Sequence, residues 1–104
     1  MTEYRIEIAG KAKQDLREIY LYVANTLQEP DIAIKLIDKL ETEILTLKNM
    51  PMRCAPYRDE QLKRRNLRKL IVDNYLVFYT IYEKNQTVFI VRILYARRDW
   101  INLL

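Results

Sequence analysis

The spacing of apolar side chains changes twice along this sequence, and these changes limit the folds that are open to it. Apolar and charged residues alternate from Glu3 to Ala9, a period of two that indicates a half-buried strand. From about Lys11 to Asn25 the apolar residues recur every three or four positions, which predicts an amphipathic helix. Glu29-Pro30-Asp31 predicts the start of a second helix, and Met50-Pro51 predicts its end. A short connection of this kind favours an antiparallel helix hairpin.

The second half of the chain returns to the spacing of strands. Met50 to Lys63 contains two prolines and mixed charges, which predicts a loop. Three strands rich in β-branched and aromatic residues follow, at Asn66–Val72, Tyr75–Tyr82 and Thr87–Tyr95. Asp73-Asn74 predicts a tight turn between the first two of them. The expected order is β-α-α-β-β-β, an α+β fold in which the helix hairpin packs on a mainly antiparallel four-stranded sheet, with the other face partly covered.

Size and residue usage exclude several classes of protein. With 104 residues the chain has the length of one domain, which we expect to span residues 1–104. No apolar run reaches the roughly 20 residues that cross a bilayer, and the first residues lack the apolar stretch of a signal peptide, so we expect a cytoplasmic protein without a membrane partner. With one cysteine, Cys54, and no histidine, no intrachain disulfide is possible, and neither a metal nor another cofactor is expected.

The net charge of +4 is unevenly distributed. Residues 1–50 carry seven basic and nine acidic side chains, whereas residues 51–104 carry eleven basic and five acidic ones. A surface built from the basic half is typical of proteins that bind a polyanion or an acidic partner. A solvated basic surface without a special partner is the alternative that charge alone leaves open.

Three stretches of the sequence resemble the RelE/ParE superfamily of bacterial toxins. The first expected helix resembles that of ParE-type toxins in the pattern Ala12-x-x-Asp15-Leu16-x-x-Ile19-x-x-Tyr22. The segment from Arg68 through Asp73-Asn74 to Tyr79 resembles the strand pair of the superfamily, and Val91 to Asp99 resembles its last strand and basic tail.

This resemblance implies the toxin of a type II toxin–antitoxin pair. Such a toxin is neutralised by a cognate antitoxin, here expected to be acidic, in a hetero-oligomeric complex. ParE-like members inhibit DNA gyrase, whereas RelE-like members cleave messenger RNA on the ribosome. Whether the chain is an enzyme therefore depends on the branch, and an enzyme of this kind would be a metal-independent endoribonuclease.

Candidate site residues lie in the basic half of the chain. If RNA is cleaved, Arg68, Arg92, Tyr95 and Arg97 supply the residue types that clamp a phosphate and donate a proton. Strand alternation places Ile90 and Leu94 on the same face as Arg92, so this arginine must reach solvent, pair with an acid or line a cleft. For each of them a solvated or ion-paired side chain is the alternative.

Further residues are candidates for contacts with a nucleic acid or another target. They are the basic and aromatic residues Lys63, Arg64, Arg65, Arg98 and Trp100. A basic loop that protects a sheet edge is the alternative for the first three. Tyr75, Tyr79 and Tyr82 are expected in the core and at its rim.

Departures from the RNA-cleaving branch favour the gyrase-inhibiting one. In an alignment through Tyr75 to Tyr79, Ile71 and Ile101 stand where that branch carries an arginine and a tyrosine. No histidine is present to replace the one used by a sister branch. The sequence thus favours a ParE-like inhibitor of DNA gyrase, with a ribosome-dependent mRNA endonuclease as the alternative. A general nucleic-acid-binding module is a third possibility, but it does not account for the first-helix pattern.

Overall fold

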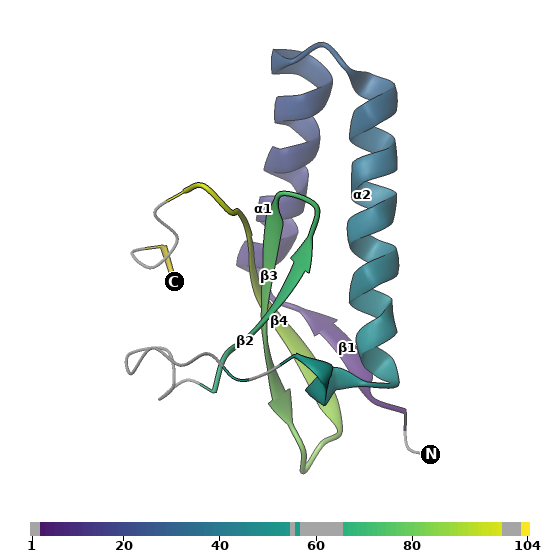
Figure 1. Cartoon of the computed structure of the whole chain (residues 1–104), viewed down its shortest axis with the longest axis vertical. Helices are drawn as coiled ribbons and strands as arrows, with labels where there is room; N and C mark the ends of the chain where they lie inside the picture. The colour runs from purple at the N-terminus through teal and green to yellow at the C-terminus, as the bar shows by residue number, and fades with distance from the viewer. Residues whose placement is uncertain (1–2, 55, 57–65, 99–102) are drawn as a thin grey trace.

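Two helices pack against one face of a four-stranded sheet (Figure 1). This computed structural model describes residues 3–54, 56, 66–98 and 103–104. Its main elements are β1 (Arg5–Ile8), α1 (Gly10–Leu21), α2 (Pro30–Leu45), β2 (Arg68–Val72), β3 (Tyr75–Tyr82) and β4 (Thr87–Tyr95). The predicted α+β fold and the predicted order of elements are confirmed.

The two helices end in turns that are not α-helical. A π-helical turn, Tyr22–Thr26, follows α1, and the N–H of Leu27 donates to the carbonyl of Tyr22 at 3.0 Å. Pro30 begins α2, where its missing N–H costs no hydrogen bond. A 3₁₀ turn, Thr46–Lys48, follows this helix. Both predicted helices are therefore present, but the last turn expected of the first is π-helical and that of the second is 3₁₀.

The sheet has the strand order β1-β4-β3-β2. β1 runs parallel to β4, and the other neighbouring strands are antiparallel, as a mainly antiparallel sheet requires. The predicted turn between β2 and β3 is confirmed, and within it Asp73 has a φ of 52°. An aspartate tolerates this left-handed conformation better than most residues.

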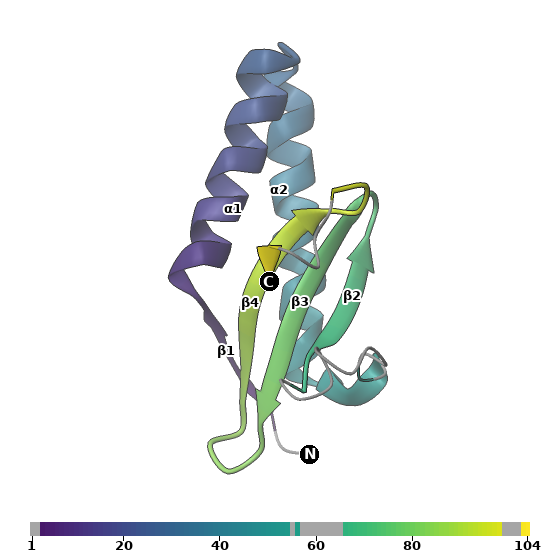
Figure 2. The same cartoon turned by 90° about the vertical axis from the view of Figure 1, so that its left-hand side faces the viewer.

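Each face of the sheet has its own apolar cluster. The larger one lies under the helices and includes the fully buried Leu40, Ile44 and Ile90. The smaller one, Leu76, Phe78 and Leu94, lies on the other face, where Leu103 and Leu104 pack against it. Figure 2 shows the end of the chain in front of the sheet and the helices behind it. The expectation that the second face is partly covered is confirmed.

A β-bulge in β4 changes which residues share a face. Phe78 is paired with Arg92, whereas the next residue, Tyr79, is paired with Ile90, so Val91 is the extra residue. As a result Ile90 packs under the helices, while Leu94 packs in the cluster on the other face. The expectation that both flank Arg92 on one face was wrong for Ile90, because simple alternation does not allow for a bulge.

Within the ranges that the structure describes, no helix combines the length and the apolar character needed to span a membrane.

Candidate functional site

Asp15 of α1 and Arg92 of β4 form a buried ion pair. Arg92 Nε donates to Asp15 Oδ2 at 2.8 Å and Nη2 donates to Oδ1 at 3.0 Å, which is the two-point geometry that guanidinium and carboxylate groups favour. The side chains are only 14% and 7% exposed. The backbone N–H of Ile93 also donates to Asp15 Oδ2, at 2.9 Å. Asp15 thus accepts a hydrogen bond from a backbone N–H of β4 just beyond the point where β1 stops pairing with β4.

The same arginine holds the end of the chain. Arg92 Nη1 donates to the carbonyl oxygen of Leu103 at 2.7 Å. The hydrogen bonds that Arg92 donates to Asp15 raise the pKa of Arg92 above its usual value, so the guanidinium is charged at every physiological pH. Of the three possibilities predicted for Arg92, the structure has the pairing with an acid. The pair joins a helix, a strand and the C-terminal residues.

A second group of polar contacts lies at the start of β2. Arg68 Nη1 donates to the carbonyl oxygen of Cys54 at 2.6 Å, and the buried Tyr79 hydroxyl donates to the carbonyl oxygen of Pro51 at 2.7 Å. Burial raises the pKa of the Tyr79 phenol far above its usual value, and the neighbouring Cys54 adds to the shift. These contacts attach residues 51–54 to the sheet, and Tyr79 is a core residue as predicted.

An apolar groove of about 880 Å³ lies between the helix hairpin and the end of the sheet that carries the β2–β3 turn. Figure 1 shows both helices extending well beyond this turn. The apolar lining comes from Ile19, Tyr22, Val23, Leu27, Ile32 and Leu36 of the helical part and from Tyr75, Ile93, Leu94 and Tyr95 of the sheet. Tyr22, Leu27 and Ile32 are 54%, 51% and 54% exposed, so about half of each of these large side chains is uncovered. Uncovered apolar surface of this kind marks a site for another molecule.

The rim of the groove is charged. The lining has three basic and three acidic residues, which are Lys35, Lys39, Arg98, Asp15, Glu18 and Asp73. Lys39 Nζ donates to Asp73 Oδ1 at 2.7 Å, which ties α2 to the β2–β3 turn and raises the pKa of Lys39. A groove with an apolar floor and charges of both signs at its rim suits an amphipathic segment.

The four residues predicted for RNA cleavage do not come together. Arg68 is paired with Tyr79, which packs under the helices, whereas Arg92 is paired with Phe78 on the opposite face. Tyr95 lines the groove, with its ring 5.6 Å from that of Tyr75 in a T-shaped arrangement. Arg97 is exposed just after β4. Arg68 also donates a hydrogen bond to the carbonyl oxygen of Cys54, and Arg92 donates to the carboxylate of Asp15.

Of the residues predicted to contact a nucleic acid or another target, Arg98 lines the groove. Lys63, Arg64, Arg65 and Trp100 lie outside the described residues. Within the described ranges no three Cys, Asp or Glu side chains are grouped so as to hold a metal ion.

Sequence reasoning missed the role of Asp15 and the groove. An acidic residue in the apolar stripe of Ala12, Leu16 and Ile19 was a usable signal, because a buried carboxylate requires a cation or several donors. The groove left no comparable signal, since the same apolar spacing describes a helix face that is covered and one that is not.

Solved structures of toxins share this arrangement. The chromosomal ParDE toxin–antitoxin system from P. aeruginosa matches with a TM-score of 0.75 at 18% identity, covering 91% of this chain and 98% of that one. The RelBE2 toxin–antitoxin complex from Mycobacterium tuberculosis matches with a TM-score of 0.64 at 22% identity, covering 91% and 93%. A mutant of the E. coli toxin RelE in the free state matches with a TM-score of 0.67 at 12% identity, covering 98% and 93%. By sequence, the chain matches no curated protein closely enough to count as a relative.

The fold is similar to that of these solved structures. Residues 6–100 match the family model described as the ParE toxin of the type II toxin–antitoxin system parDE. The chain therefore belongs to the ParE toxin family.

Proposed function

We propose that the chain is a toxin that inhibits DNA gyrase and is neutralised by an acidic antitoxin, part of which occupies the groove. The observation that carries the antitoxin proposal is the uncovered apolar floor of the groove. An amphipathic segment that folds on contact would cover this surface. Two of the similar solved structures are described as a toxin–antitoxin system or complex, which supports a partner of this type.

A pair of matched substitutions tests the groove. Ile32 and Ile34 lie two positions apart on α2 and are 54% and 51% exposed, but only Ile32 lines the groove. Ile32→Asp should weaken binding of the neighbouring gene's product at least tenfold by calorimetry, whereas Ile34→Asp should leave it within twofold. Equal effects of the two substitutions would contradict the proposal.

The proposal of gyrase as the target rests on the scattered basic residues. Cleavage of RNA without a metal requires a base, an acid and a phosphate clamp within reach of one phosphate. Arg92 holds Asp15 and Leu103, so its guanidinium is committed within the fold, whereas Arg68 uses only Nη1, on the carbonyl oxygen of Cys54. The mRNA endonuclease is the second candidate, with Arg68, Tyr95 and Arg97 as its available residues. Both candidate targets are cytoplasmic, and we propose that the protein acts there as a single domain.

Induction of the toxin separates the two targets. A gyrase inhibitor should change plasmid supercoiling and impair replication before protein synthesis falls. Arg97→Ala should relieve growth arrest if this exposed arginine contacts the target, and Lys84→Ala, in the exposed β3–β4 turn, is its control. Immediate arrest of translation with cuts at ribosomal A-site codons would assign the protein to the endonuclease class instead.

A further inference from the structure

The outer edge of β1 has hydrogen-bonding groups that the described chain does not use. β1 is the edge strand next to β4. The N–H groups of Arg5 and Ala9 donate to the carbonyls of Gln86 and Ile90, at 2.8 and 2.9 Å, on the side of β4. Because backbone groups alternate in direction along a strand, those of Ile6 point the opposite way. Among the residues that the structure describes, Ile6 has no hydrogen-bond partner on that outer side.

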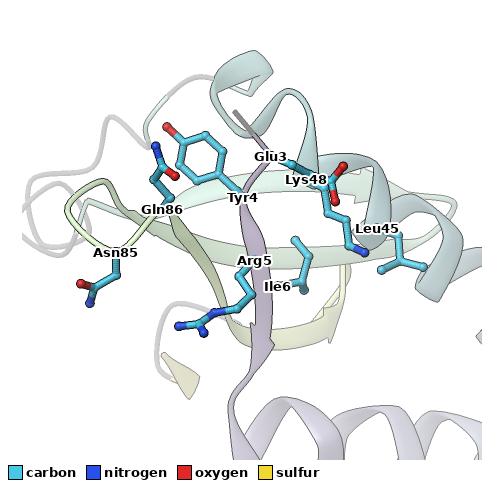
Figure 3. A pocket seen from close by; sticks show the side chains of 8 residues that line it. All are labelled: Glu3, Tyr4, Arg5, Ile6, Leu45, Lys48, Asn85 and Gln86. Atoms are coloured by element: carbon cyan, nitrogen blue, oxygen red, sulfur yellow. The ribbon is translucent and has the colours of Figure 1, made fainter. Parts of the chain in front are cut away.

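A hollow of about 640 Å³ runs beside this edge (Figure 3). Four consecutive residues, Glu3 to Ile6, line it, together with Leu45 and Lys48 near the end of α2 and the β3–β4 turn residues Asn85 and Gln86. Figure 3 shows Leu45 and Lys48 on one side of the strand and Arg5 with Asn85 on the other. Leu45 is 50% exposed, so the hollow offers an apolar contact beside the free edge. The N–H of Tyr4 donates to the carbonyl oxygen of Lys48 at 2.8 Å, so the free edge begins just after Tyr4.

The charges on this edge are self-complementary. Arg5 and Glu7 lie on the same face of β1, with Arg5 Nη2 3.6 Å from Glu7 Oε1, and their side chains are 71% and 53% exposed. If two copies of β1 pair antiparallel with Ile6 opposite Ile6, Arg5 of each copy lies opposite Glu7 of the other copy. The register with Ile6 opposite Ile8 would place Glu7 opposite Glu7, and like charges in that position are destabilising.

We propose that β1 is a self-association edge, at which two copies of the chain pair antiparallel and join their sheets. Charged side chains on an edge strand usually prevent such pairing, because copies carry the same sign at the same place. Here Arg5, the apolar Ile6 and Glu7 follow one another, and this order favours one register of self-pairing. The contact is small compared with stable dimer interfaces, so the association is weak and depends on concentration and on salt. The hollow and the groove share no lining residue, so the proposed antitoxin and a second copy bind different surfaces.

Charge-swapped variants of the full chain test this edge. Sedimentation analysis over a concentration series at low salt should show reversible dimers of the unaltered protein. Glu7→Arg should weaken self-association at least tenfold, because Arg5 then faces arginine, and Arg5→Glu should do the same with two carboxylates. The double variant Arg5→Glu/Glu7→Arg should restore association. An equal mixture of the two single variants should associate at least as well as the unaltered protein.

Other results would overturn the proposal. They are a protein that stays monomeric throughout the series, single variants that dimerise normally, and a double variant that is not rescued. A monomeric chain whose Glu7→Arg variant loses affinity for the antitoxin would assign the edge to a strand of that partner instead. Both positions are exposed, so circular dichroism should show unchanged folding in each variant. The antitoxin and gyrase proposals are unaffected by either outcome.

Discussion

Two ion pairs join a helix to the sheet, and they have almost the same length. Arg92 Nε lies 2.8 Å from Asp15 Oδ2, and Lys39 Nζ lies 2.7 Å from Asp73 Oδ1. The first pair is nearly buried and carries further hydrogen bonds from Ile93 and to Leu103. The second is about half exposed and makes a single contact.

The comparison shows that distance is a poor guide to what an ion pair contributes. Water screens the exposed pair and hydrates both groups when they separate, so little free energy depends on it. The buried groups have lost their hydration, and each depends on the other for compensation. We therefore expect the Asp15–Arg92 pair to determine whether the fold holds, and the Lys39–Asp73 pair to adjust the rim of the groove.

Removal of Asp15 should give the largest effect. Asp15→Ala leaves the Arg92 guanidinium buried without its counter-charge and the N–H of Ile93 without an acceptor, which should lower the free energy of unfolding by about 3–5 kcal/mol. Urea denaturation measures the loss. The double variant Asp15→Leu/Arg92→Met should be more stable than Asp15→Ala, because it leaves no uncompensated charge. A loss below about 1 kcal/mol for Asp15→Ala would mean that this pair resembles the exposed one.

Tyr79 should give an intermediate effect that depends on pH. Tyr79→Phe leaves the carbonyl of Pro51 without its buried donor and should cost about 1–3 kcal/mol. The pKa of this phenol is raised on folding, so its stabilising effect is complete below the unfolded value of 10.0 and is lost as the pH rises above it. The unaltered protein should lose up to about 1.4 kcal/mol per pH unit in that range from this group. Thermal melts from pH 8 to 11 on both proteins check the slope, and identical slopes would contradict the assignment.

Lys39→Ala should give the smallest effect on stability. An exposed pair of this type contributes little to stability, and added salt should reduce the difference further. Chemical denaturation at low and high salt measures it. A loss comparable to that of Asp15→Ala would remove the distinction between the two pairs.

Local patterns predicted the elements well because they report on local physics. The β-branched and aromatic residues of Tyr75–Tyr82 and Thr87–Tyr95 gave both strands with the bounds that the structure has. The spacing of apolar residues likewise gave the helix that begins at Pro30. In each case the residues that favour the element lie within the segment itself.

The site could not be predicted in the same way, because it depends on pairs that are distant in the sequence. Asp15 and Arg92 belong to different elements, and nothing near either residue identifies the other as its partner. The bulge at Val91 also reverses the expected face of Arg92 relative to Ile90, and no signal in the strand announces it. Lys63 and its basic neighbours were predicted from charge, and Arg97 from the residue types that RNA cleavage requires; both indicate a class of partner but not a place.

The pairing of β1 with β4 has a consequence for the order of events during synthesis. Arg5 lies opposite Thr87, so β1 has no neighbour in the described sheet until β4 has also emerged from the ribosome. β4 is also the strand that holds α1 through Asp15. Contacts this distant in sequence form late, because a long loop must be closed first. The helix hairpin and β1 therefore lack a complete sheet to pack against while the chain is being made. A nascent toxin cannot assemble its final surfaces until β4 has been translated.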